Sequence, residues 1–151
     1  MRKRLVLIAL AVAVASVMVF DGPASAGKPG TGTLREAELT GAEVVPGPGD
    51  ADGTGTADLN LIPKRERICY TLTVQNIEPA TDAHIHKGTS TVAGPIVKAL
   101  RAPSTGSSQG CVRLDRAKIM KIKNNPSGYY VNVHNDEFSG GAVRGQLSPS
   151  P

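Results

Sequence analysis

The residues of this sequence best suited to chemistry are its three histidines, which fall in two short segments. His84 and His86 flank a single apolar residue, and His134 ends a largely apolar run that begins at Tyr129. Residues two apart in a β-strand share a face, so His84 and His86 would project from one side with Cα atoms about 6.5–7 Å apart. Imidazole nitrogens are ligands of zinc and copper. The three histidines are therefore candidate ligands of a Cu or Zn ion, with water in an open position.

The same histidines also have a structural interpretation. Where their strands end, they could hydrogen-bond the backbone of neighbouring loops, and no cofactor would then be required. We predict that the three rings converge at one rim of the fold whether or not metal binds, and the metal interpretation requires this convergence. Alternation in the second segment assigns three residues to the core, Tyr129, Val131 and Val133, and three to the outer face, Tyr130, Asn132 and His134.

Nucleophilic catalysis has little support in the sequence. The serines cluster in loop-like segments, and none lies in a Gly-x-Ser-x-Gly element. Asp136 and Glu137 are adjacent acids close to His134, but adjacent acids in a hairpin loop point apart and are best interpreted as solvated. Glu43 could be a buried acid, and an ion pair with Arg144 is the milder interpretation. We therefore predict no catalytic residues and a protein that is not an enzyme.

Two cysteines, Cys69 and Cys111, are the only ones in the chain. In an exported protein, two cysteines indicate one disulfide. Each alternates with apolar residues, so both sulfurs should lie on the outer face of two neighbouring strands, with Cα atoms about 5.5 Å apart. Such a bridge would contribute on the order of 3–4 kcal/mol.

Residues 1–26 have the three-part layout of a secretory signal peptide. Arg2, Lys3 and Arg4 precede an uncharged apolar stretch over residues 5–20, and Ala24-Ser25-Ala26 forms a small-x-small cleavage site. A membrane anchor is the alternative, although 16 apolar residues are fewer than the roughly 20 that span a bilayer. We predict cleavage after Ala26, a secreted protein and no membrane span after cleavage.

The charge of the remaining chain is nearly balanced. Removing Arg2, Lys3, Arg4 and Asp21 takes three of 17 basic and one of 13 acidic residues, which leaves 14 and 12, or about +2. That balance argues against nucleic acid as a partner. The chain has no tryptophan, two phenylalanines and three tyrosines, so its core must be mostly aliphatic and it has no evident platform for stacking bases or sugars.

Period-2 alternation with threonine-rich outer faces predicts an antiparallel sheet with one wet side. Asp115 could cap a short helix over residues 116–123, which Asn125-Pro126 would end. A flexible leader over residues 27–36, one domain over 37–148 and a tail over 149–151 complete the expected organisation. Alternating residues predict strands at 37–44, 54–62, 68–77, 96–100, 110–114, 129–134 and 142–147, besides the segment that carries the first two histidines.

Several of these segments together resemble the CHRD domain. The resemblance is carried by His-x-His-x-Gly followed by Gly-Pro-Ile-Val, by Tyr-Val-Asn-Val-His, and by Val-Arg-Gly-Gln-Leu. It extends from about residue 38 to 147. Residues 89–93 lack a glycine often found there, and Ser139-Gly140-Gly141 stands where Pro-Gly is commoner. The family motif is matched, besides the histidines, by Glu43, Gly88, Gly94, Tyr130, Asn132, Arg144 and Gly145.

The resemblance implies an all-β, antiparallel Greek-key β-sandwich, immunoglobulin-like or copper–zinc superoxide dismutase-like, with one short helix before the penultimate strand. It implies a secreted, non-enzymatic binding or structural module, with an extracellular protein or matrix component as partner. The alternative is an extracellular Cu/Zn-binding protein, with redox activity open. In copper–zinc superoxide dismutases an outward His-x-His pair and a later histidine bind copper, but those enzymes use further histidines and this chain has only three.

Overall fold

The computed structural model describes residues 32–150, so the expected signal peptide and the first half of the expected leader lie outside the described residues. One helix, α1, spans Arg116–Asn124, and three short 3-10 turns are η1 (Gly41–Glu43), η2 (Pro63–Arg65) and η3 (Pro126–Gly128). The nine strands are β1 (Thr33–Thr40), β2 (Thr54–Ile62), β3 (Arg67–Gln75), β4 (Asp82–Lys87), β5 (Ile96–Leu100), β6 (Ser107–Arg113), β7 (Tyr129–His134), β8 (Val143–Gln146) and β9 (Ser148–Pro149).

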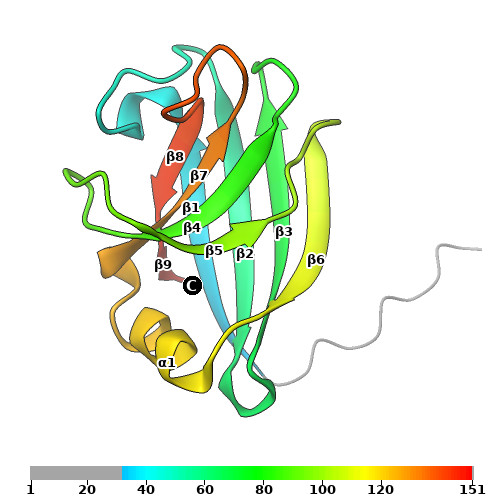
Figure 1. Ribbon diagram of the computed structural model, residues 1–151, viewed down its shortest axis with the longest axis vertical. Helices are drawn as coiled ribbons and strands as arrows, with labels where there is room; N and C mark the ends of the chain where they lie inside the picture. The colour runs from blue at the N-terminus through cyan, green and yellow to red at the C-terminus, as the bar shows by residue number, and fades with distance from the viewer. Residues whose placement is uncertain (1–31, 151) are drawn as a thin grey trace, which may run out of the picture.

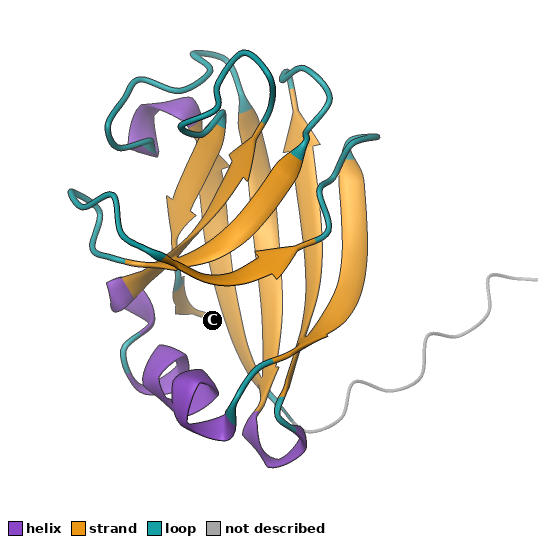
Figure 2. Ribbon diagram, in the orientation of Figure 1, coloured by secondary structure: helices purple, strands orange, loops and turns teal. Residues whose placement is uncertain are grey.

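The strands form two layers that face each other across one core (Figures 1 and 2). Hydrogen bonding runs in the order β5-β4-β7-β8-β1-β2-β3-β6, with β9 added to β1. Every pairing is antiparallel, and the layers join where Thr40 of β1 pairs with Arg144 of β8. β3 pairs with β6 and β4 pairs with β7, as in a Greek key. The predicted all-β antiparallel sandwich is confirmed.

The period-2 alternation of β2 and β3 sets the register in which these two strands pair. Leu59 and Tyr70 are partners across the two strands and both point into the core, as do the neighbouring pairs two residues away. Leu59 and Leu72 are fully buried, while Asp58 and Thr71 between them face solvent. Because a slip of one residue would exchange these faces, the apolar pattern holds the register.

The predicted disulfide between Cys69 and Cys111 is present. The two residues are direct partners across β3 and β6, and their side chains lie on the outer face, opposite core-facing Ile68 and Tyr70. Their Cα atoms are 3.9 Å apart, closer than the expected 5.5 Å. Close approach is typical of the non-hydrogen-bonded pairs of an antiparallel ladder.

Strand boundaries differ from the sequence predictions at three places. β1 begins at Thr33, within the expected leader, and ends at Thr40, after which residues 41–43 form a 3-10 turn. β6 starts at Ser107, inside an expected loop, because residues 107–109 complete the ladder with β3. Ser148 and Pro149, expected near or in the tail, pair with β1 as β9. In each case pairing with a distant strand orders residues that carry little local strand signal.

Helix α1 covers one end of the sandwich. Ile119 and Ile122 are buried against the core, which confirms the expected apolar face. Asp115 occupies the N-cap position, but its side chain makes no capping hydrogen bond and instead lies 3.6 Å from Lys118. Within residues 32–150, no helix has the length and apolar character that crossing a membrane would require.

The candidate metal centre

The three histidines lie on the outer face of two paired strands, β4 and β7. His84 is the partner of Asn132, His86 is the partner of Tyr130, and His134 is the partner of Asp82. This antiparallel register places His134 diagonally next to His84. The ring centroids are 5.2 Å apart for His84 and His134, 5.6 Å for His84 and His86, and 6.3 Å for His86 and His134. The predicted convergence of the three rings is present, but they lie along the outer face of β4 and β7 rather than at a rim.

Two of the imidazole rings are oriented by backbone carbonyls. His86 Nδ1 lies 2.9 Å from the carbonyl oxygen of Gly94, and His134 Nδ1 lies 2.9 Å from that of Ser139. A carbonyl oxygen only accepts hydrogen bonds, so each Nδ1 must carry the proton. In the neutral ring, Nε2 then carries a free lone pair. Metal-ligating histidines are commonly fixed in this way through the second ring nitrogen.

Each ring also presents one buried nitrogen that has no hydrogen-bond partner. These atoms are Nδ1 of His84, Nε2 of His86 and Nε2 of His134. Leaving a buried polar atom unpaired costs about 1–3 kcal/mol, so three such atoms together at one place need an explanation. The nitrogen ligand atoms of the three residues lie within 4.8 Å of one another. The arrangement brings one ring nitrogen from each of three histidines around one small space.

The spacing of these nitrogens is close to what one ion requires. Two nitrogens of a tetrahedral site that each bind the ion at about 2.0–2.1 Å are about 3.4 Å apart. The ligand atoms here all lie within 4.8 Å of one another, so the widest possible pair would close by at most about 1.4 Å on binding. The three donors would leave a further coordination position for water.

The electrostatic setting favours neutral imidazoles at two of the three positions. Burial lowers the pKa of His84, and the neighbouring charge of His134 lowers it further, while Asp82 opposes both. Burial is also the main cause that lowers the pKa of His86. The hydrogen bond to Gly94 opposes that shift, and the charges of His84, His134 and Arg144 add to it. Neutral imidazole is the form that binds a metal ion.

His86, Tyr130 and Arg144 form a stack of three side chains. The ring of Tyr130 lies parallel to that of His86, with centroids 4.8 Å apart and planes 9° apart. The guanidinium carbon of Arg144 lies 3.6 Å from the centroid of Tyr130 on its π face. The Tyr130 hydroxyl accepts a hydrogen bond from the backbone N–H of Gly94 at 3.0 Å. Gly94 therefore contacts both rings.

The loop over residues 88–95 covers this part of the outer face. Arg144 Nη2 donates to the carbonyl oxygen of Thr89 at 2.7 Å, and Gln146 Nε2 donates to that of Gly88 at 2.7 Å. A side chain at Gly94 would collide with the backbone of Lys87. Glycine is therefore required where the loop crosses the end of β4, next to His86.

Tyr130, Asn132 and Arg144 are buried although they project from the outer face of the sheet. Their exposed fractions are 2, 4 and 1 %. The predicted alternation is correct, but the expectation of outer-face solvation is wrong, because loops on either side cover these residues. Asn132 Nδ2, for example, donates to the carbonyl oxygen of Gly140 in the β7–β8 hairpin. Gly145 lies so close to the backbone of Glu38 that a side chain there would collide with it.

Two predictions about acidic residues have different outcomes. Glu43 is exposed in η1, and no ion pair joins it to Arg144 among the described residues, so both earlier interpretations of Glu43 are wrong. Its charge still opposes the lowering of the Arg144 pKa that burial causes. Asp136 and Glu137 are exposed in the hairpin loop, as expected, and neither belongs to the histidine cluster.

Sequence reasoning missed the groups that orient the rings. The carbonyl oxygens of Gly94 and Ser139 carry no sequence signal, since every residue has one. Gln146 was also missed as a loop anchor, although it lies in the Val-Arg-Gly-Gln-Leu segment: its amide nitrogen lies 2.7 Å from three carbonyl oxygens, those of Gly88, Ser127 and Tyr129.

Comparison with protein families matches residues 35–147 to the family described as the CHRD domain. That range begins inside β1 and ends just after β8, so it contains both histidine-bearing strands and the helix. Comparison with curated proteins gives no match.

Proposed function

This chain belongs to the CHRD domain family, and from that premise we propose that it is a secreted binding module that holds one copper or zinc ion. The ligands are His84 Nδ1, His86 Nε2 and His134 Nε2. The observation that carries the proposal is the set of three buried, unpaired imidazole nitrogens, one from each ring, that gather at one place. A bound ion would accept all three lone pairs at once.

The purely structural interpretation accounts for only part of the geometry. It explains Nδ1 of His86 and Nδ1 of His134, which bond loop carbonyls. It does not explain His84, whose ring makes no hydrogen bond to any described residue and whose Nδ1 is buried. Loop support therefore gives no reason for a buried, unpartnered nitrogen on His84 beside two other imidazoles.

The donor set limits which ion fits. Three neutral imidazoles suit copper and zinc, and for a given nitrogen site Cu²⁺ binds more tightly than Zn²⁺. The ligands add no negative charge, so a divalent ion keeps its full charge. Because there are only three of them, the ion also retains an open position for water or another small ligand. We therefore expect both ions to bind, with copper preferred.

Export is the second part of the proposal. Its supports are the signal-peptide layout of residues 1–26 and the disulfide between Cys69 and Cys111. Disulfides persist in oxidising compartments outside the cytosol. N-terminal sequencing of protein recovered from the medium or cell envelope tests it, and a chain that still begins at Met1 would contradict cleavage after Ala26.

The metal proposal is tested by calorimetric titration of protein purified without a histidine tag. We expect one Cu²⁺ or Zn²⁺ per chain, with the NMR signals of all three rings perturbed together. His84→Gln should abolish stoichiometric binding. Asp136→Asn, which changes an exposed acid near His134, is the matched control and should bind normally. Absence of stoichiometric binding, or binding unchanged in His84→Gln, would reject the site and leave a metal-free binding or structural module.

A further inference from the structure

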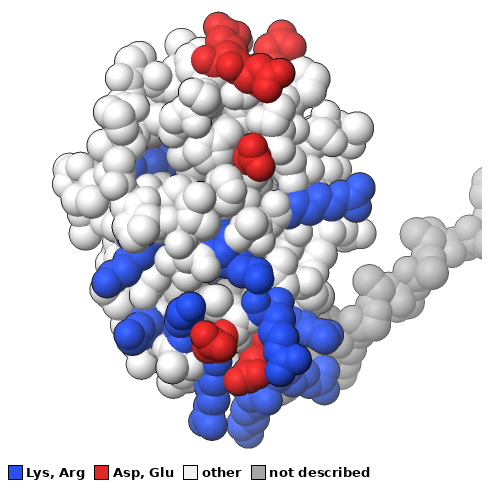
Figure 3. Space-filling model, in the orientation of Figure 1, with Lys and Arg blue, Asp and Glu red and all other residues white. Residues whose placement is uncertain are grey.

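Charge is strongly separated along the long axis of the domain (Figure 3). Lysines and arginines gather at the end that carries α1 and the turn between β2 and β3, and acidic residues gather at the opposite end. The basic end is formed by Lys64, Arg65, Arg67, Arg113, Arg116, Lys118, Lys121 and Lys123, with only Glu66 and Asp115 among them. The near-zero total charge of the domain conceals this separation.

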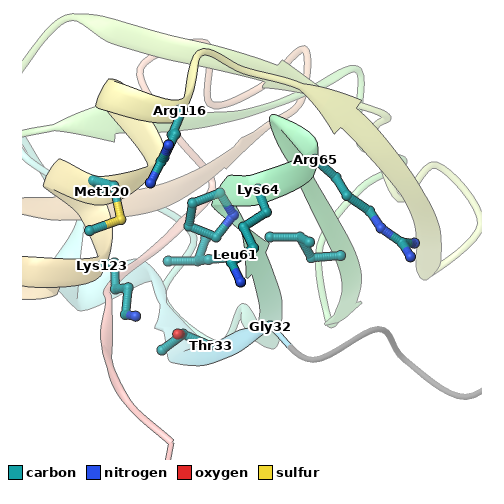
Figure 4. Close-up of a pocket in the computed structure, with 10 residues that line it drawn as sticks. Gly32, Thr33, Leu61, Lys64, Arg65, Arg116, Met120 and Lys123 are labelled. Atoms are coloured by element: carbon teal, nitrogen blue, oxygen red, sulfur yellow. The ribbon is translucent and has the colours of Figure 1, made fainter.

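A cavity of about 470 Å³ opens at the basic end, between α1, η2 and the start of β1 (Figure 4). Arg116, Lys64 and Lys123 reach toward this opening, whereas Arg65 points away from it. Thr33 adds a hydroxyl at the rim. Apolar side chains complete the lining, namely Leu61, Ile62, Pro63 and Met120.

No described carboxylate neutralises Arg116, Lys64 and Lys123, the three cations that reach toward this cavity. The two acids of the basic end are engaged elsewhere: Glu66 pairs with Arg113 at 3.0 Å, and Asp115 pairs with Lys118 at 3.6 Å. Neither acid lines the cavity. Three like charges around one space repel each other, and a bound anion would remove that repulsion.

Helix α1, which carries Lys123, is hydrogen-bonded to the sheet. Arg35 Nη2 donates to the carbonyl oxygen of Lys123 at 2.7 Å, which joins the last turn of α1 to β1. Ile119 and Ile122 anchor the same helix in the core. Arg116 and Lys123 therefore project from a helix that is held in place, which lowers the entropy lost when a ligand binds.

We propose that this cavity binds the phosphate ester group of an organic ligand, with Arg116, Lys64 and Lys123 as its anion-binding residues. A phosphate ester carries up to about two negative charges and three strong acceptor oxygens, which matches three converging cations. A carboxylate carries one charge. The cavity is within the size range of small-molecule sites, and its apolar lining provides a surface for the carbon skeleton next to the phosphate.

This site is separate from the histidine centre, which lies on β4 and β7, so the two proposals fail independently. The ligand could be a soluble phosphate ester or the headgroup of a phospholipid. Glycerol 3-phosphate and inorganic phosphate serve as soluble probes, read by chemical-shift changes and calorimetry. Vesicles of phosphatidylcholine with and without phosphatidic acid, whose headgroup is a phosphate monoester, serve as the lipid probe and are read by co-sedimentation.

The decisive comparison uses two variants with equal loss of charge. Arg116→Gln/Lys123→Gln removes two cavity cations, and Lys98→Gln/Arg101→Gln removes two cations on and just after β5. We expect the cavity variant to bind at least about tenfold more weakly, as loss of charged hydrogen bonds implies, and the β5 variant to bind normally. Binding of glycerol 3-phosphate would identify a soluble ester, and binding only to phosphatidic acid vesicles would identify a lipid headgroup.

Three results would overturn the proposal. The first is absence of binding to every probe. The second is an equal loss of affinity in the two variants, which would show that binding depends only on the net charge of the protein. The third is inorganic phosphate binding as tightly as glycerol 3-phosphate. That result would show that the apolar lining contributes nothing to affinity and that the ligand need not be organic.

Discussion

Arg144 lies face-on against Tyr130, with its guanidinium carbon 3.6 Å from the ring centroid, and is only 1 % exposed. The opposite face of Tyr130 stacks on His86. Arg144 also donates to the carbonyl oxygen of Thr89. A buried cation without a described carboxylate partner thus joins the covering loop to the side chain that supports a candidate ligand.

Replacing Arg144 should therefore destabilise the domain. We expect Arg144→Met to lower the free energy of unfolding by about 2–3 kcal/mol, through loss of a charged hydrogen bond and a cation–π contact. Urea denaturation measures the loss, and hydrogen exchange should increase in residues 88–95. Arg101→Met, at an exposed position, is the control. Equal stability of the two variants would show that Arg144 does not hold the loop.

His84 should be separable from the other histidines because it makes no hydrogen bond to a described residue. In the metal-free protein, we expect His84→Gln to change the free energy of unfolding by at most about 0.5 kcal/mol. His134→Gln should cost more, since it removes the bond to Ser139. With metal, thermal unfolding should shift upward for the unmodified protein alone. A large loss in metal-free His84→Gln would mean that this ring has a structural role instead.

Acid should destabilise the metal-free protein through His84 and His86. Both pKa values are lowered in the folded state, so between those values and about 6.5 the unfolded chain binds more protons. The contribution is therefore complete above about pH 6.5 and is lost as pH falls through the folded pKa values. Urea midpoints measured across this range should fall with pH, and less steeply in His84→Gln/His86→Gln. Parallel curves for the two proteins would contradict the prediction.

Removing the disulfide should cost about 3–4 kcal/mol of stability, since the bridge joins residues 42 apart in sequence. We expect Cys69→Ser/Cys111→Ser to unfold at lower temperature and to retain metal stoichiometry, because the bridge joins β3 and β6 in the other layer. Calorimetry measures both quantities. Loss of metal binding in a variant that remains folded would show that the two layers are coupled.

Alternation in the sequence was sufficient to predict the two faces of most strands. It placed His84, His86 and His134 on outer faces, Val131 and Val133 in the core, and the two cysteines on neighbouring strands. These features depend on the period of two residues in a strand, which is a local property of the chain. For the same reason α1 was predicted to within one residue, because Ile119, Ile122 and the Asn-Pro pair mark it locally.

Only the tertiary structure decided what covers those faces. Tyr130, Asn132 and Arg144 are buried because loops lie over them, and the alternation of β7 and β8 does not reveal that cover. The carbonyl oxygens of Gly94 and Ser139 orient His86 and His134, yet a backbone carbonyl is the same in every residue. The cavity at the basic end likewise joins Thr33, Lys64 and Lys123. Strand periodicity is local, whereas these contacts depend on how the two layers and their loops close.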